Sequence, residues 1–128
     1  MTDGSGRTVG SWEVDTSVAL EKPYYKAIKN GEKTIHIDKE LHGLEEGEDG
    51  ERLVRWMNGY NYKNGYVITT VPEIISVPLE QLTDGELEKA NVDMDWVENY
   101  ADNQDEVYLF FLGDVLIVGY EEGYEGLR

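Results

Sequence analysis

The spacing of apolar residues changes along this chain, and the change limits the folds that the chain can adopt. In several short stretches apolar residues alternate with polar ones, which is typical of half-buried strands. Between residues 87 and 101 they recur every three or four positions, as on one face of a helix, at Leu87, Ala90, Met94, Val97 and Ala101. Short strands combined with a helical segment predict an α+β domain.

The alternating stretches predict six or seven short strands, over residues 12–20, 33–39, 52–57, 66–71, 74–77, 107–112 and 115–120. Pro23 and Gly31 predict a two-turn helix after the first strand, because proline suits the first helical turn and glycine the position after the last. Residues 91–93 are expected to break the later helical segment in two, with Asp93 capping the second helix. Pro72 marks an edge or a bulge between two strands.

A chain of 128 residues is long enough for one domain with its own core. We expect a single domain over residues 12–120, a flexible N-terminus over residues 1–11 and an acidic C-terminal tail over residues 121–128. The chain has no cysteine, which excludes disulfides and thiolate metal sites, and no run of about 18 apolar residues that would predict a membrane-spanning helix. These features predict a cytoplasmic protein that does not associate with membranes.

The chain is strongly acidic, with 27 aspartates and glutamates against 11 lysines and arginines and a formal net charge of −16. Hydrophobic residues make up 40% of it, which is too many for a disordered acidic tail. An electrostatic field of this sign repels phosphate backbones and argues against general nucleic-acid binding. Three explanations of the charge stay open: solubility, a high-salt habitat, and imitation of a polyanion.

The order of elements along most of the chain is similar to that of a known family. A short helix ends at Gly31, Lys33 follows it and leads into a strand, and a later strand leads into helices and a final strand. The matching stretches are residues 25–38, 77–83, 86–100 and 107–111. This arrangement resembles ASCH domains. The resemblance implies a small PUA-like mixed β-barrel with a short N-terminal helix and a helical segment before the last strands, a fold that usually binds RNA or a nucleoside in a cleft.

Within that family the chain most resembles the bacterial acetylcytidine amidohydrolases, whose strand motif reads Lys-Thr-Ile-Thr-x-Arg. Residues 33–35 match the first three positions. The branch's catalytic threonine falls on His36, its motif arginine on Asp38, and a glutamate of its helical segment on Ala90. Because only Lys33 of the hydrolytic set is kept, the resemblance implies a non-catalytic module that does not hydrolyse acetylcytidine.

Lys33, His36 and Asp38 are nevertheless candidates for a rebuilt catalytic site. On the expected strand His36 and Asp38 share one face, so Asp38 could orient the imidazole while His36 acts as a general base beside Lys33. The alternative is a solvated strand face with mixed charges. His36 and His42 make a weak ligand set for zinc, so we expect neither a metal nor a cofactor.

Acidic residues form two clusters outside this stretch. Glu45, Glu46, Glu48 and Asp49 lie in an acidic loop, and Asp95, Glu98 and Asp102 recur at helical spacing opposite the apolar face. A solvated surface explains either cluster, but carboxylate rows also imitate a duplex, which carries about one charge per 1.7 Å of its axis.

We therefore predict that these acidic clusters bind a protein partner with a basic channel, such as a restriction or CRISPR enzyme that the protein inhibits. The alternative is an ASCH-type RNA-binding, nucleoside-binding or amidohydrolase domain that works through Lys33.

Overall fold

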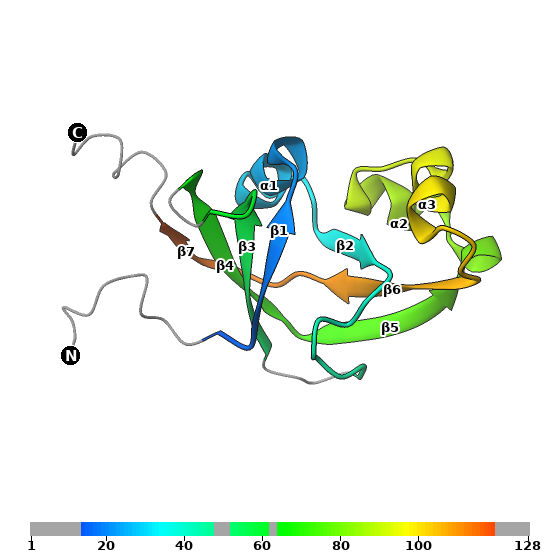
Figure 1. Ribbon diagram of the computed structural model, residues 1–128, viewed down its shortest axis with the longest axis horizontal. Coiled ribbons are helices and arrows are strands. Elements are labelled where there is room, and N and C mark those ends of the chain that lie inside the picture. Colours follow the sequence, from blue (N-terminus) through cyan, green and yellow to red (C-terminus); the bar gives the residue numbers. More distant parts are fainter. Residues whose placement is uncertain (1–13, 48–51, 62–63, 120–128) are drawn as a thin grey trace.

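The computed structural model describes residues 14–47, 52–61 and 64–119, which form two β-sheets and three α-helices (Figure 1). The strands of the four-stranded sheet are, in spatial order, β1 (Thr16–Leu20), β3 (Arg52–Asn58), β4 (Tyr66–Val71) and β7 (Val115–Gly119). Those of the three-stranded sheet are β2 (Ile35–Asp38), β6 (Glu106–Phe111) and β5 (Glu73–Pro78). β1 and β3 are parallel, and the other neighbouring strands are antiparallel. The helices are α1 (Lys22–Lys29), α2 (Asp84–Ala90) and α3 (Met94–Ala101), with a short 3-10 helix, η3 (Leu79–Gln81), before α2.

The α+β class expected from the sequence is confirmed, but the described strands form two separate sheets and do not close into one barrel. The chain passes directly from one sheet to the other between β4 and β5 and again between β6 and β7. Pro72 lies at the first crossing, where its missing N–H ends the hydrogen-bond ladder of β4. Gly113 lies at the second, where an added Cβ would overlap the hydroxyl of Thr70. Both crossings therefore depend on residues that a continuous strand would not favour.

The break between the two later helices is confirmed, and local hydrogen bonds explain it. Asn91 ends α2 in the left-handed conformation, at φ 62°, which asparagine tolerates better than most residues. The carboxylate of Asp93 then accepts a hydrogen bond from the backbone N–H of Trp96 at 2.8 Å and begins α3. α2 begins with a capping box, in which Thr83 and Glu86 each accept a hydrogen bond from the other's backbone N–H, at 3.1 and 3.0 Å.

Two expected strands are shorter in the structure than in the sequence pattern. The first begins at Thr16, and Trp12, where it was expected to start, lies outside the described residues. The second, β2, covers only Ile35–Asp38. The flexible N-terminus and the acidic tail expected at the two ends also lie outside the described residues.

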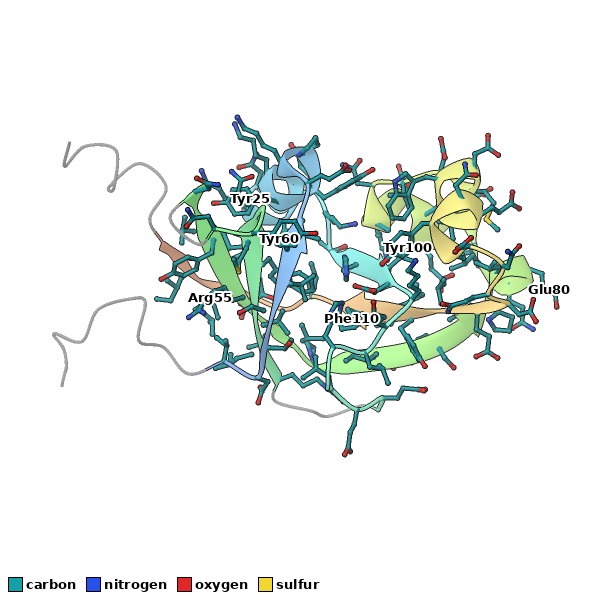
Figure 2. The ribbon with its side chains drawn as sticks, in the orientation of Figure 1. Tyr25, Arg55, Tyr60, Glu80, Tyr100 and Phe110 are labelled. Atoms are coloured by element: carbon teal, nitrogen blue, oxygen red, sulfur yellow. The ribbon has the colours of Figure 1, made fainter. Side chains whose placement is uncertain are left out.

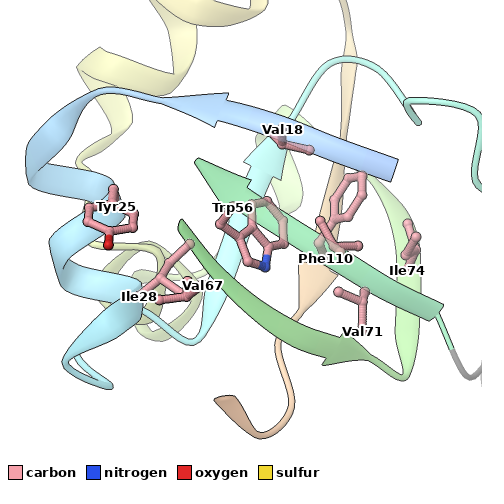
Figure 3. Packing of buried hydrophobic residues seen from close by; sticks show 9 residues of the cluster. Val18, Tyr25, Ile28, Trp56, Val67, Val71, Ile74 and Phe110 are labelled. Atoms are coloured by element: carbon pink, nitrogen blue, oxygen red, sulfur yellow. The ribbon is translucent and has the colours of Figure 1, made fainter. Parts of the chain in front are cut away.

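Trp56 joins the two sheets in the larger hydrophobic cluster (Figure 3). Its indole lies between Tyr25 and Ile28 of α1 on one side and Phe110 of β6 on the other. Trp56 is fully buried, and its indole N–H donates to the hydroxyl of Thr69 at 2.9 Å, so its polar atom is also satisfied. Because both sheets and α1 contribute to this cluster, its packing holds them together.

The helices α2 and α3 cover one face of the three-stranded sheet (Figure 1). Four of the five apolar residues that predicted helical periodicity are buried there, and Met94 is half-buried. They pack against a set of sheet residues made up of Ile35, Ile37, Val77, Val107 and Leu109. Within the described ranges, no helix is long and apolar enough to span a membrane.

Candidate functional site

The turn after α1 directs Lys33 into the interior of the protein. Gly31 follows the helix at φ +80°, a conformation that strains any residue with a Cβ. The backbone N–H of Lys33 then donates to the carbonyl of Ala27 at 3.0 Å. The side chain is only 4% exposed, its Nζ donates to the carbonyl of Ala90, and it lies 5.3 Å from the centre of the Tyr24 ring. The ammonium group therefore lies at the C-terminal end of α2, where the carbonyl dipoles stabilise positive charge.

Both faces of β2 are buried, so the expected alternative of a solvated strand face is wrong. Ile35 and Ile37 pack against the helices, and His36 and Asp38 on the opposite face are 6% and 3% exposed. The His36 ring packs edge-on against Trp56 of the neighbouring sheet, with the ring centres 4.9 Å apart. Alternation in the sequence predicted which residues share a face, but not that the second sheet covers the polar one.

Asp38 accepts four hydrogen bonds. Its Oδ2 accepts from Nε2 of His36 at 2.8 Å and from Nε2 of His42 at 2.6 Å. Its Oδ1 accepts from the hydroxyl of Tyr100 at 2.8 Å and from the backbone N–H of Glu40 at 3.0 Å. Both imidazole nitrogens donate because an ionised carboxylate only accepts. Asp38 thus ties β2 to the loop that follows it and to α3, the helix from which Tyr100 projects (Figure 2).

These contacts set the charge of each group. Burial favours a neutral Asp38, but hydrogen bonds from His36, His42 and Tyr100 outweigh it and hold the pKa of the carboxyl well below its usual range. Burial lowers the pKa of His36 against the opposing effect of Asp38, so the imidazole is neutral at neutral pH. Burial also lowers the pKa of Lys33 to about 8, which leaves the ammonium form predominant at neutral pH. Asp38 is therefore a compensated anion, His36 is a neutral imidazole and Lys33 is a cation.

Lys33 and His36 line a cavity of about 490 Å³, within the range of about 300–1,000 Å³ that is usual for small-molecule sites. Trp96 and Tyr100, one turn apart on α3, form an aromatic wall with stacked rings, 4.8 Å between centres and 13° between planes. Tyr24 of α1 extends this wall, with its ring centre 5.7 Å from that of Trp96. The other lining residues are Ala19, Leu20, Glu21, Ile37 and Asn99. Aromatic walls with a few polar groups are typical of sites for planar organic ligands.

The structure brings together all three residues of the proposed rebuilt site, and their chemistry is complementary. An imidazole that donates through one nitrogen to a buried carboxylate can accept a proton through the other. An ammonium group beside it can stabilise a developing oxyanion. None of the residues that line the cavity is a serine, threonine or cysteine, so the cavity lacks the hydroxyl or thiol nucleophiles that most covalent hydrolases use.

Metal-ligating side chains do not gather in the described ranges: no group of three or more could hold a metal ion. His36 and His42 approach each other at the Asp38 carboxylate, and both donate to the same oxygen. Their convergence therefore serves to hold Asp38.

The acidic residues predicted to bind a partner are exposed wherever the structure describes them. Glu45 and Glu46 lie in the loop after β2, and Glu48 and Asp49 lie outside the described residues. Asp95, Glu98 and Asp102 are exposed on α3 or directly after it. A partner surface on these residues stays a prediction.

The aromatic wall and the hydrogen bond from His42 to Asp38 were not expected from the sequence. Trp96 and Tyr100 are four residues apart in a predicted helix, a spacing that places both on one face and could have identified the wall. From the sequence, His42 is expected only as a weak metal ligand. It lies in a loop with φ 54°, a conformation that no periodic pattern predicts.

Two sheets, three helices and a cavity of about 490 Å³ define a small α+β domain with a hollow beside its helices. Its fold is ASCH-like, as solved structures show. The crystal structure of ASCH from Zymomonas mobilis is similar to it with a TM-score of 0.65 and 13% sequence identity, over 88% of this chain and 77% of that chain. The crystal structure of a tyrosine-to-phenylalanine mutant of that protein has a TM-score of 0.65 and 13% sequence identity, over 88% of this chain and 79% of the mutant chain. At this identity the likeness confirms the predicted PUA-like fold alone. No protein-family model and no curated protein matches the chain.

Proposed function

We propose that the protein binds a small planar ligand of the nucleoside class in the cavity between α1, β2 and α3. The observation that carries this proposal is the lining of that cavity, in which three aromatic side chains surround two buried titratable residues, Lys33 and His36. Aromatic rings stack on a base, and the titratable groups offer hydrogen bonds to its edge. The sequence resemblance to ASCH domains, which implies RNA or nucleoside binding, supports the same class of ligand.

Substitution of one tyrosine in the cavity and one outside it tests this proposal. Tyr24→Ala removes a lining ring, whereas Tyr60→Ala removes a side chain that is 94% exposed (Figure 2). Titration calorimetry with cytidine, acetylcytidine, uridine and adenosine should show binding to the wild type. We expect Tyr24→Ala to weaken it by about tenfold or more, since stacking contributes about 1–3 kcal/mol per base, and Tyr60→Ala to leave it unchanged. Equal effects of the two substitutions, or no binding by any nucleoside, would contradict the proposal.

We expect binding without hydrolysis of acetylcytidine. The sequence resemblance aligns the catalytic threonine of the amidohydrolases with His36, and none of the lining residues is a serine, threonine or cysteine that could replace it. Chromatography of acetylcytidine incubated with the protein should therefore recover the substrate intact. Turnover that disappears in Lys33→Ala would instead assign the rebuilt site of Lys33, His36 and Asp38 to hydrolysis.

A second candidate function uses the exposed acidic surface. Asp95 and Glu98 on α3 and Asp102 directly after it are all exposed, which supports the prediction that carboxylates occupy the basic channel of a nucleic-acid enzyme. DNA cleavage by a panel of restriction and CRISPR nucleases, measured with and without the protein, tests it. Inhibition should weaken with added salt and with Asp95→Asn, Glu98→Gln and Asp102→Asn combined. If cleavage is unaffected throughout, or inhibition survives the neutralised variant, the prediction is wrong.

A further inference from the structure

Lys33 is a buried cation for which the described part of the chain supplies no counterion. Its ammonium group has three N–H donors, and the contacts it makes are with the carbonyl of Ala90 and the face of the Tyr24 ring. Neither contact carries a full negative charge. No carboxylate of the described residues lies within ion-pair distance of Lys33, in a chain where acidic residues outnumber basic ones by more than two to one.

Asp38, the buried carboxylate of the site, is already compensated by its own partners. Each of its two oxygens accepts two hydrogen bonds, from His36 and His42 at Oδ2 and from Tyr100 and the Glu40 backbone at Oδ1. These four donors fill the usual capacity of a carboxylate. Asp38 therefore has no free acceptor position for Lys33, and it does not neutralise the charge of that lysine.

An uncompensated ammonium group at a cavity wall is costly to the protein alone and attractive to an anion. The C-terminal dipole of α2 offsets part of that cost, because Ala90 is the last residue of the helix. The net charge of −16 acts mostly from the outer surface, where salt screens it beyond about 8–10 Å. At the wall of the cavity the nearby positive charge therefore decides which ligand is favoured.

We propose that the ligand of this cavity is a planar ring that carries a negatively charged oxygen, which it places against the Lys33 ammonium. This inference rests on the proposed function of the cavity as a ligand site and adds the charge of the ligand. The aromatic wall of Tyr24, Trp96 and Tyr100 selects the planar ring. The ammonium donors not used by Ala90 select the anionic oxygen.

Among the other groups around Lys33, Glu21 carries a negative charge that opposes an anion, and solvent weakens this repulsion because Glu21 is exposed. His36 is neutral, and burial beside Glu21 and Asp93 raises the pKa of Tyr24, so its hydroxyl stays protonated. Glu21 lines the cavity but is exposed to solvent, and Tyr100 holds its proton against Asp38. Lys33 is therefore the group whose charge distinguishes an anionic ligand from a neutral one of the same shape.

Two pairs of probes, each matched in shape but different in charge, test the inference: nicotinate against nicotinamide, and orotate against uracil. Calorimetric titrations near neutral pH would use the wild type, Lys33→Met and Lys26→Met, the last removing an exposed lysine of α1 as a control. We expect the wild type and Lys26→Met to bind the anionic member of at least one pair about tenfold more tightly or better, a difference of about 1.4 kcal/mol. Lys33→Met should abolish this preference, so that both members of a pair bind with the same affinity.

A pH arm provides the same test without a substitution. Nicotinate keeps its charge from about pH 7 to about pH 9.5, whereas Lys33, with a pKa of about 8, loses its own. The preference of the wild type for nicotinate should therefore decline across this range. Binding of the neutral probes without a preference for the anions overturns the inference and leaves the proposed function intact. A preference that survives in Lys33→Met also overturns it, and so does a failure of every probe to bind at millimolar concentration, whereas the proposed function falls only if the nucleosides fail to bind as well.

Discussion

Lys33 and Asp38 are both almost fully buried, yet the protein stabilises their charges in different ways. Asp38 accepts four hydrogen bonds from three side chains and one backbone group. Lys33 has one carbonyl and one aromatic face. The same burial therefore leaves Asp38 as a stabilising anion and Lys33 as a cation that costs stability, and the two residues should respond to pH in opposite regions of the scale.

For Lys33 we predict that stability rises with pH above the neutral range. Its pKa falls from 10.5 in the unfolded chain to about 8 in the folded protein. Between these values the unfolded chain holds more protons, so the free energy of unfolding increases with pH. Between the neutral range and about pH 10 the free energy of unfolding of the wild type should rise, relative to that of Lys33→Met, by an amount on the order of 3 kcal/mol, since each pKa unit corresponds to about 1.4 kcal/mol. Denaturant unfolding of both proteins at about pH 7 and about pH 10 measures it, and parallel pH dependences would contradict the prediction.

Asp38 should contribute stability at neutral pH that is lost in acid. Its pKa lies below the ordinary value of 3.8, so the contribution is complete above that value and declines as the pH falls further. Asp38→Asn should lower the free energy of unfolding by about 1.5–3 kcal/mol at neutral pH, the usual range for hydrogen bonds to a charged group. Tyr100→Phe, which removes one of the four donors, should cost less. A difference between wild type and Asp38→Asn that is as large at about pH 3 as at about pH 7 would show that the carboxylate charge is not responsible.

Among the elements, the short helix α2 has a role beyond its own packing. Its seven residues are too few for independent stability, so its ends and its contacts hold it in place. The capping box of Thr83 and Glu86 fixes the first turn, and the last carbonyl contacts Lys33. Thr34 extends this link, because its backbone N–H donates to the carbonyl of Lys89 at 2.9 Å. α2 thus connects the cap at one end to the cavity at the other.

Loss of the cap should therefore affect both stability and the site. Thr83→Ala removes the side-chain acceptor and should lower the free energy of unfolding by about 1 kcal/mol, whereas Thr83→Ser keeps the hydroxyl and should cost much less. Hydrogen exchange at the α2 amides should increase in Thr83→Ala before exchange in the strands does. Equal stabilities of the alanine and serine variants would indicate that the cap contributes nothing.

The whole molecule combines a strongly negative surface with a cavity that contains the buried lysine Lys33. The exposed carboxylates on α3 make no ion pair with the described residues, so they add charge without adding contacts. Like charges at this density repel one another and disfavour the compact state. The exposed carboxylates on the surface therefore do not stabilise the fold, and the buried hydrophobic core does.

Neutralisation of the α3 carboxylates should accordingly leave the fold intact. The combined variant Asp95→Asn, Glu98→Gln and Asp102→Asn should have an unchanged or higher Tm at low salt, because self-repulsion falls, and the difference should shrink as salt is added. Asn is suitable at position 102 because it tolerates the left-handed φ of 51° found there. Calorimetric scans at low and high salt measure the effect. A clear fall in Tm at both salt concentrations would show that these carboxylates stabilise the fold.

The sequence by itself determined which segments form elements and where several of them end. Apolar spacing identified β3, β4, β6 and the split helical segment, because periodicity and caps act over a few residues. Gly31 and Lys33 pointed to the ASCH-like fold for the same local reason. The sequence also indicated the candidate residues Lys33, His36 and Asp38.

Only the tertiary structure decided that these candidates are buried, and that Asp38 meets His42 and Tyr100 while Lys33 meets the end of α2. It also decided that the strands form two sheets instead of one closed barrel. Tyr100 is 62 residues from Asp38, and Ala90 is 57 residues from Lys33. Contacts over such distances depend on how sheets and helices pack on one another, which the local periodicity of a sequence does not specify.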